Sequence, residues 1–331
     1  MKIFISHQHK RLGPYSLEEA RDLVYSGAVV RSDLAWQDGD ASSVPLDRLL
    51  NSLPTTDAVA TAAVTPDTAN PMSQLRDPLE DTALTWLYVA SIPVWLLLLF
   101  WVVVTLGFGL FPILLMVLAK VFGEWWFAAQ LKANAVCVSE TQLPEVHQAV
   151  KHCSACLGIE PPAVYVLQQN VWNAFAVKLT NHRSVILLSG AVDSVLLKGN
   201  QHQLAWLVGH ELGHHAAGHR DFKRRLASLG GWMIWLYLWY SRRAEFTCDR
   251  AGLYCAGSLH ASQRALINAT VGAQLADQVN VAEAIAQWSQ QREDFLVKCR
   301  ILFSTHPHLS ARLEQLAAAA REFGMVNSQA S

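Results

Sequence analysis

An uncharged run over 82–119 constrains the fold of this 331-residue chain more than any other feature. It reads TALTWLYVASIPVWLLLLFWVVVTLGFGLFPILLMVLA, between Asp81 and Lys120. One membrane-spanning helix needs about 20 apolar residues. The run therefore predicts a hairpin of two short transmembrane helices over 83–119. One tilted or kinked span is the alternative. The composition, 52% hydrophobic and 16% charged residues, is typical of a membrane protein.

Charges beside this run indicate its orientation. Arg76, Lys120 and Lys132 flank its outer ends, and the tip between the two predicted helices carries no Lys or Arg. Positive charges favour the cytosolic side of a membrane. We therefore expect an integral protein of a bacterial inner membrane, with both ends of the hairpin and the following domain in the cytoplasm. A single span would place that domain across the membrane from the N-terminus.

Residues 1–52 have the pattern of a small α+β module. An amphipathic helix is predicted from Ser16 to Ser26. The order GPYS, LEEARDLVYSGAV, LAWQDG and PLDRLL resembles the GYF-like modules of bacterial membrane proteins. Ser43 and Val44 stand where such modules often carry a second Trp, which argues against recognition of proline-rich ligands. We expect an unknown protein partner for this module.

Residues 53–82 are rich in Pro, Thr, Ala and Asp. Such a segment is too polar and too often broken by Pro to bury a core. It is predicted to be a disordered linker that tethers the module.

Charge and cysteine content exclude other classes of protein. A formal net charge of -1 provides no basic field for nucleic acid, so no nucleic-acid partner is expected. Six Cys without an export signal are expected to stay reduced. Cys153 and Cys156 form a lone CxxC in a helical stretch, which favours helix packing over metal binding or redox chemistry.

Residues 130–322 have the pattern of an α+β domain that is mainly helical. A helix is predicted near 141–157, followed by strands in AVYVLQQ, NAFAV and SVILLSG and then by further helices. The predicted fold class is thus a mainly helical catalytic domain with a small sheet, preceded by the transmembrane hairpin and the N-terminal α+β module.

The sequence HELGH at 210–214 is the strongest chemical signal. On a helix, His210 and His214 lie one turn apart on one face, where both imidazoles can bind one zinc ion. Glu211 projects beside them and can take a proton from the attacking water without binding the metal. The pattern predicts a hydrolytic zinc site with Glu211 as the catalytic residue.

A catalytic zinc needs a third protein ligand, for which the candidates are His215, His219 and Glu245. His215 points about 100° away from His214 around the helix, which favours a surface or outer-shell role. His219 stands at the wrong offset for the zincin signature with a third His, so a structural role is favoured. Glu245 and Asp249 share a helix face, which suits a ligand and an outer-shell partner.

Three blocks, HELGHHAAGH, RRAEFTCDRAGLY and STHPHLSARLEQL, resemble the HtpX-like and CaaX-endopeptidase-like membrane zinc metallopeptidases of family 48. The similarity extends over about 130–320. It implies a zincin-type fold and one zinc ion held by His210, His214 and Glu245, with Glu211 catalytic and Asp249 in the outer shell. His306, in THPH, resembles a family histidine near the metal that stabilises the oxyanion or fills the fourth ligand position; a surface-loop role is the alternative.

Two further segments bear on how a substrate reaches this site. We expect NAFAV or SVILLSG to bind the substrate backbone as an added strand, the alternative being an ordinary core strand. The uncharged stretch 226–241 is too short for two membrane crossings, and one crossing would separate Glu245 from His210. It should pack beside the site or lie in the membrane interface.

The expected function is zinc-dependent endopeptidase activity at a membrane, on membrane or misfolded proteins, in quality control. Membrane lipid is the second expected partner. A chaperone-like binding protein with a structural zinc is the alternative. Processing of prenylated C-terminal peptides is disfavoured, because one short hairpin leaves little room for a lipid chamber.

Overall fold

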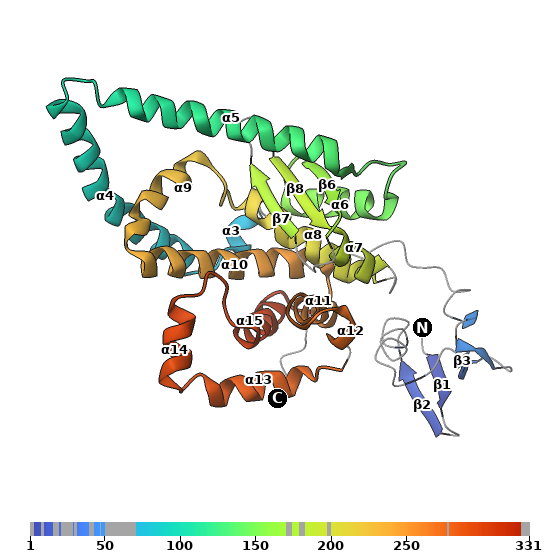
Figure 1. Ribbon diagram of the computed structural model, residues 1–331. Helices are drawn as coiled ribbons and strands as arrows, with labels where there is room; N and C mark the ends of the chain where they lie inside the picture. The colour runs from blue at the N-terminus through green and yellow to red at the C-terminus, as the bar shows by residue number, and fades with distance from the viewer. Residues whose placement is uncertain are drawn as a thin grey trace. The chain divides into compact units, whose positions relative to one another are not determined.

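The computed structural model describes residues 3–7, 10–15, 20, 29, 32–39, 43–46, 48–49, 71–169, 174–178, 183–196, 200–276 and 278–325. The chain divides into two compact units, Met1–Val64 and Thr65–Ser331. The architecture is mainly helical with two small sheets (Figure 1), which confirms the predicted fold class.

The first unit contains an antiparallel sheet in the order β2-β1-β3-β4. Ile3, Ile5 and Ala35 point to one face and are fully buried with Leu46, because alternate side chains of a strand share a face. Most of the predicted helix Ser16–Ser26 lies outside the described residues. The strands are β1 (Ile3–His7), β2 (Lys10–Tyr15), β3 (Leu34–Gln37) and β4 (Val44–Pro45).

The apolar run forms two helices, α4 (Glu80–Val104) and α5 (Leu110–Asn134), each long and apolar enough to cross a membrane. Residues 105–109 connect them, with Gly107 at φ +89°. Together the two helices extend beyond the predicted 83–119 at both ends. The second continues past Lys120, whose Nζ pairs with Glu124 Oε1 one turn later at 2.6 Å.

The predicted linker 53–82 is wrong over its last residues. Residues 71–82 include the short helix α3 (Met72–Leu75) and the start of α4. Met72 and Leu75 are buried in the core of the second unit, and their apolar side chains explain why this part is ordered. The remainder of the predicted linker, up to residue 70, lies outside the described residues.

The second unit contains a mixed sheet in the order β5-β6-β8-β7. β6 and β8 are parallel, whereas β5–β6 and β7–β8 are antiparallel. β7 is therefore an edge strand among the described strands, and β8 is internal. The strands are β5 (Val136–Cys137), β6 (Ala163–Leu167), β7 (Ala174–Lys178) and β8 (Arg183–Leu188).

Two helices form the centre of this unit, α8 (Gln201–Ala216) and α10 (Ile234–Ala256). α8 packs against the sheet and against α10 (Figure 1). Further helices surround the pair: α6 (Pro144–Leu157), α7 (Ser189–Leu196), α9 (Phe222–Ala227), the 3₁₀ helix η1 (Ser228–Trp232), α11 (Leu259–Val271), α12 (Ala273–Ala276), α13 (Val281–Gln291), α14 (Phe295–Leu302) and α15 (Leu309–Glu322).

Glycines allow α8 and α10 to approach closely. A Cβ added to Gly252 of α10 would lie 2.8 Å from the carbonyl oxygen of Trp206. On α8, a Cβ on Gly209 would lie 3.1 Å from Gly252 Cα, and one on Gly213 would lie 3.0 Å from Ala251 Cβ. The two backbones are thus close enough for side chains of both helices to converge on one point.

The uncharged stretch 226–241 packs against the first membrane helix. Trp232 Nε1 donates to the Ala90 carbonyl at 2.8 Å, and Leu87 of α4 packs with Tyr240 and Ala227. A Cβ on Gly230 would collide with the Leu87 carbonyl oxygen. The stretch runs from the end of α9 through η1 into α10 alongside α4 and brings Glu245 back to the histidines of α8, as predicted.

The six cysteines are free thiols. Cys153 is fully buried in the core beneath α6, consistent with the helix-packing interpretation of the CxxC pair. Cys156 Sγ lies 3.6 Å from His152 Nε2.

Replacing Gly252 with Ala should force α8 and α10 apart. Overpacking of this kind costs roughly 1–3 kcal/mol, so the thermal unfolding temperature of the detergent-solubilised protein should fall. Gly231→Ala is the matched control, because its added Cβ would meet Tyr237 atoms at an ordinary 3.8 Å. Equal unfolding temperatures for the two variants would contradict the close helix crossing.

Candidate metal centre

α8 presents two imidazoles on one face. Its N-terminus is capped by Asn200, whose side chain accepts from the Gln203 backbone amide at 3.0 Å. His210 and His214 follow at i and i+4 and are both buried. Burial lowers the pKa of His214 well below its usual value and so favours the neutral imidazole that a metal requires.

α10 brings a carboxylate to these imidazoles. His210 Nε2 lies 3.6 Å from Glu245 Oε2, and His214 Nε2 lies 3.7 Å from Glu245 Oε1. One ligand atom from each of the three side chains lies within 4.8 Å of the others. The structure thus brings together the three residues that the sequence predicted as metal ligands.

The second ring nitrogen of His210 is held by the predicted outer-shell residue. His210 Nδ1 lies 3.1 Å from Asp249 Oδ1. Arg312 of α15 donates twice to the same carboxylate, from Nε to Oδ2 at 2.8 Å and from Nη2 to Oδ1 at 2.6 Å. Burial opposes ionisation of Asp249, but Arg312 and His210 hold its pKa below the ordinary value. Sequence reasoning missed Arg312, because nothing local pairs α15 with α10.

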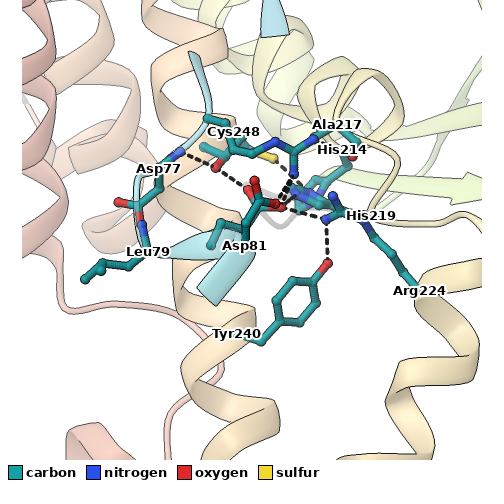
Figure 2. Close-up of polar contacts among 12 residues, drawn as sticks. Asp77, Leu79, Asp81, His214, Ala217, His219, Arg224, Tyr240 and Cys248 are labelled. Atoms are coloured by element: carbon teal, nitrogen blue, oxygen red, sulfur yellow. Dashed lines mark hydrogen bonds and ion pairs between the residues drawn. The ribbon is translucent and has the colours of Figure 1, made fainter. Parts of the chain in front are cut away.

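The second ring nitrogen of His214 contacts another histidine. His214 Nδ1 lies 3.0 Å from His219 Nδ1 (Figure 2). His219 Nε2 lies 3.0 Å from Glu80 Oε1. His219 therefore stands behind a predicted ligand rather than among the ligands. Glu80 was also missed, because it lies far away in sequence, at the start of a membrane helix.

His215 has a different role from the surface or outer-shell one predicted. Its side chain is buried, and its Nε2 lies 3.0 Å from the carbonyl of Ser184 in β8. It therefore joins α8 to the sheet and faces away from Glu245, as the 100° rotation around the helix requires.

Glu211 lies beside the three convergent side chains. It is buried, and burial together with the neighbouring Glu245 carboxylate raises its pKa above the ordinary value, although His210 opposes this. A hydrogen bond from the backbone amide of Ala176 in β7 acts in the opposite direction. The edge strand and the predicted catalytic carboxylate are therefore in direct contact.

His306 lies on the solvent side of the group. Its Nε2 is 3.7 Å from Glu245 Oε1, while its side chain is 64% exposed. The segment before it is held by Arg242, whose Nη1 donates to the carbonyls of Leu302 and Ser304 at 3.2 and 2.8 Å. His306 thus lies near the site but outside its buried part.

A second group of possible ligands, His214, His219 and Cys248, fits a metal less well. The two histidines face each other at hydrogen-bond distance. Burial raises the pKa of the Cys248 thiol well above its ordinary value and favours the neutral form, whereas a metal binds the thiolate.

The group formed by His210, His214 and Glu245 fits a catalytic metal. Two imidazoles and one carboxylate are a known donor set for zinc sites that keep an open position. Both imidazoles have their other nitrogen held by a neighbour, as metal-bound histidines do. A buried carboxylate that is not among the three, Glu211, adds a group that can accept a proton.

Arg312→Met should destabilise the protein, because it leaves the Asp249 carboxylate buried without its charge partner. Breaking a buried ion pair costs roughly 3–5 kcal/mol, and chemical denaturation of the solubilised protein would measure the loss. Arg321→Met, at an exposed position of the same helix, should leave the free energy of unfolding unchanged. Similar values for the two variants would refute the role of Arg312.

Comparison with known proteins adds an independent line of evidence. Residues 140–228 and 221–320 match peptidase family M48, and residues 4–49 match GYF domain 2. A protease HtpX homolog of Pyrococcus furiosus is 24% identical over 62% of this chain and 84% of its own length. A protease HtpX homolog of Bifidobacterium longum is 25% identical over 62% of this chain and 81% of its own.

A plant protein is also similar to this chain. The plastoglobule-localized metallopeptidase 48 of Arabidopsis thaliana is 27% identical over 46% of this chain and 48% of its own length. No solved structure matches the chain. The family match covers more than half of the sequence and includes every residue of the convergent group, and the chain therefore belongs to peptidase family M48, as a metallopeptidase with an N-terminal GYF domain.

Proposed function

We propose that this protein is a membrane-attached zinc endopeptidase in which His210, His214 and Glu245 hold one zinc ion. One observation carries the proposal: two imidazole Nε2 atoms and one carboxylate, from helices far apart in sequence, converge among buried side chains. The protease names of the relatives support the same reaction class.

Glu211 is the general base of the proposed reaction. Zinc, when bound, polarises the scissile carbonyl and lowers the pKa of water toward ~7. The raised pKa of Glu211 makes its carboxylate a better proton acceptor near neutral pH. It takes the proton of the attacking water and passes it to the leaving amine. His306, on the solvent side, either stabilises the substrate oxyanion or fills the fourth ligand position at rest.

β7 is the proposed binding strand for the substrate backbone. The prediction left NAFAV and SVILLSG open, and β8 is paired on both sides whereas β7 has a strand on one side only among the described strands. An extended peptide that pairs with β7 would run beside Glu211, because the Ala176 amide already contacts that carboxylate. An unfolded segment supplies such a peptide more readily than a folded domain.

The membrane helices are consistent with a role in quality control, in which the substrates are membrane proteins or misfolded proteins. α4 packs directly on η1 and on α10, the helix that carries Glu245. The positions of Arg76, Lys120 and Lys132 favour a cytoplasmic catalytic domain at a bacterial inner membrane, in contact with lipid along α4 and α5. The GYF domain would recruit an unidentified protein partner.

Removal of the metal should abolish peptide-bond cleavage. The solubilised protein is incubated with unfolded casein, with and without a strong zinc chelator, and fragments are followed by electrophoresis. Activity should be lost with the chelator and return when zinc is restored, because the proposed reaction needs the ion. Zinc-loaded protein that binds casein without cutting it would favour the chaperone-like alternative with a structural metal.

Glu211→Gln should remove cleavage and leave metal binding intact. The amide keeps the shape of the side chain but accepts no proton, and general bases contribute about 10²–10⁴-fold to a rate. Casein cleavage and zinc content are measured on the same preparation. Glu283→Gln, at an exposed site on α13, serves as the control and should retain full activity. Normal cleavage by Glu211→Gln would refute the assignment.

A further inference from the structure

The first residue of the first membrane helix is a fully buried carboxylate. Glu80 has no exposed surface, although it opens a helix whose later residues are apolar and largely exposed. Burial of a charge is costly unless it is paired and hydrogen-bonded. Its oxygens are met by donors from the residue after α3, from α9 and α10, and from the segment after α8: Arg76, Arg224, Thr247 and His219.

A chain of hydrogen bonds leads from this carboxylate to a proposed metal ligand. Glu80 Oε1 lies 3.0 Å from His219 Nε2. His219 Nδ1 in turn lies 3.0 Å from His214 Nδ1 (Figure 2). The remaining nitrogen of His214, Nε2, faces Glu245. All three side chains are buried, and both histidine rings are engaged through both of their nitrogens.

The order of donors and acceptors along this chain is determined once Nε2 of His214 binds a metal. Its Nδ1 must then carry the proton, so His219 Nδ1 must accept. His219 Nε2 must in turn carry a proton and donate to Glu80. A carboxylate is an acceptor only, so Glu80 selects this arrangement of protons over the reverse one. In many metal sites a carboxylate accepts a hydrogen bond from the second nitrogen of a ligand histidine. Here the imidazole of His219 lies between the carboxylate and the ligand.

We propose that Glu80 and His219 are positioning residues for the metal site. Through these two side chains, the position of the start of the first membrane helix sets the orientation and the zinc affinity of His214. This inference rests on the proposed function, because it takes His214 as a zinc ligand. The two ligand histidines then differ in what holds their second nitrogen. His210 contacts Asp249, which Arg312 neutralises, within the catalytic domain. His214 is connected through His219 to Glu80 at the start of α4.

Other contacts at the base of α4 keep Glu80 in place. The Asp77 backbone amide donates to Thr247 Oγ1 at 2.9 Å, and Arg76 Nη2 donates to the Ala217 carbonyl at 3.1 Å. Arg224 Nη1 also donates to Tyr240 OH at 2.8 Å. The start of the membrane helix is thus bound to α10 and to the end of α8, the two helices that carry the proposed ligands.

A purely structural role for Glu80, neutralising Arg76 and Arg224, is the rival interpretation. It predicts that loss of the carboxylate weakens the protein in the same way whether or not His219 is present. The proposed chain of contacts predicts that Glu80 acts on zinc only through His219. A double-mutant cycle distinguishes the two, because coupled residues give non-additive effects.

The experiment measures the zinc affinity of full-length, detergent-solubilised protein by competition with a chromophoric chelator. Glu80→Gln and His219→Phe should each weaken zinc binding by about 10–100-fold, the usual effect of losing an outer-shell partner. The double variant should bind zinc no more weakly than His219→Phe alone. Glu283→Gln, at an exposed site on α13 far from these contacts in sequence, should bind zinc like the unmodified protein.

Two results would overturn the inference: unchanged zinc affinity in either single variant, or losses that multiply in the double variant. Should a variant fail to fold, nitrogen NMR of ¹⁵N-histidine-labelled, zinc-loaded protein replaces it, with a proton expected on His219 Nε2 and none on Nδ1; the reverse would also overturn it. Casein cleavage is scored separately. If the unmodified protein binds zinc tightly but cuts no casein, the peptidase proposal is refuted. The zinc affinities of the double-mutant cycle would still test the roles of Glu80 and His219.

Discussion

The close crossing of α8 and α10 is the contact on which the rest of the site depends. Gly209 and Gly213 on one helix and Gly252 on the other leave no room for side chains between the backbones. Side chains that flank the crossing are therefore brought within a few ångströms of each other. His210 and His214 reach Glu245 for this reason, and the same approach places Asp249 behind His210.

Elements outside the crossing contact the side chains that surround the convergent group. α15 supplies Arg312 to Asp249, β7 supplies the Ala176 amide to Glu211, and α4 supplies Glu80 to His219. Polar groups buried at this depth need partners with good geometry, since an unpaired one is costly. The catalytic domain and the membrane helices are in this sense one cooperative unit, and the site lies where their supports meet.

The sequence allowed the convergence of the central side chains to be predicted, but the residues that contact them from other elements could not be predicted from it. HELGH and the Glu245–Asp249 pair are short patterns at helical spacing, so local geometry alone places each set on one face. Glu80, Ala176 and Arg312 act through contacts between distant segments, for which a single sequence offers no spacing rule. The sequence favoured a structural role for His219, yet its link to Glu80 follows only from the tertiary fold.

The difference between local patterns and tertiary contacts also explains the errors in the predicted fold. Apolar patterns predicted the strands and the mainly helical domain, and the length of the uncharged run predicted the two membrane helices, because burial and lipid contact act on local sequence. The predicted linker extended too far because Pro, Thr, Ala and Asp make up most of its composition, while Met72 and Leu75, which order its last part, are only two apolar residues in a polar stretch. Composition averages over a segment, whereas packing depends on individual side chains.

The position of Arg312 has a consequence for biosynthesis. The carboxylate that steadies His210 is neutralised by a side chain that the ribosome adds long after both histidines have been made. A nascent chain that has reached only α10 carries the histidines and the acid with Asp249 still uncompensated. His210 therefore gains the full support of its carboxylate partner only after α15 has been made.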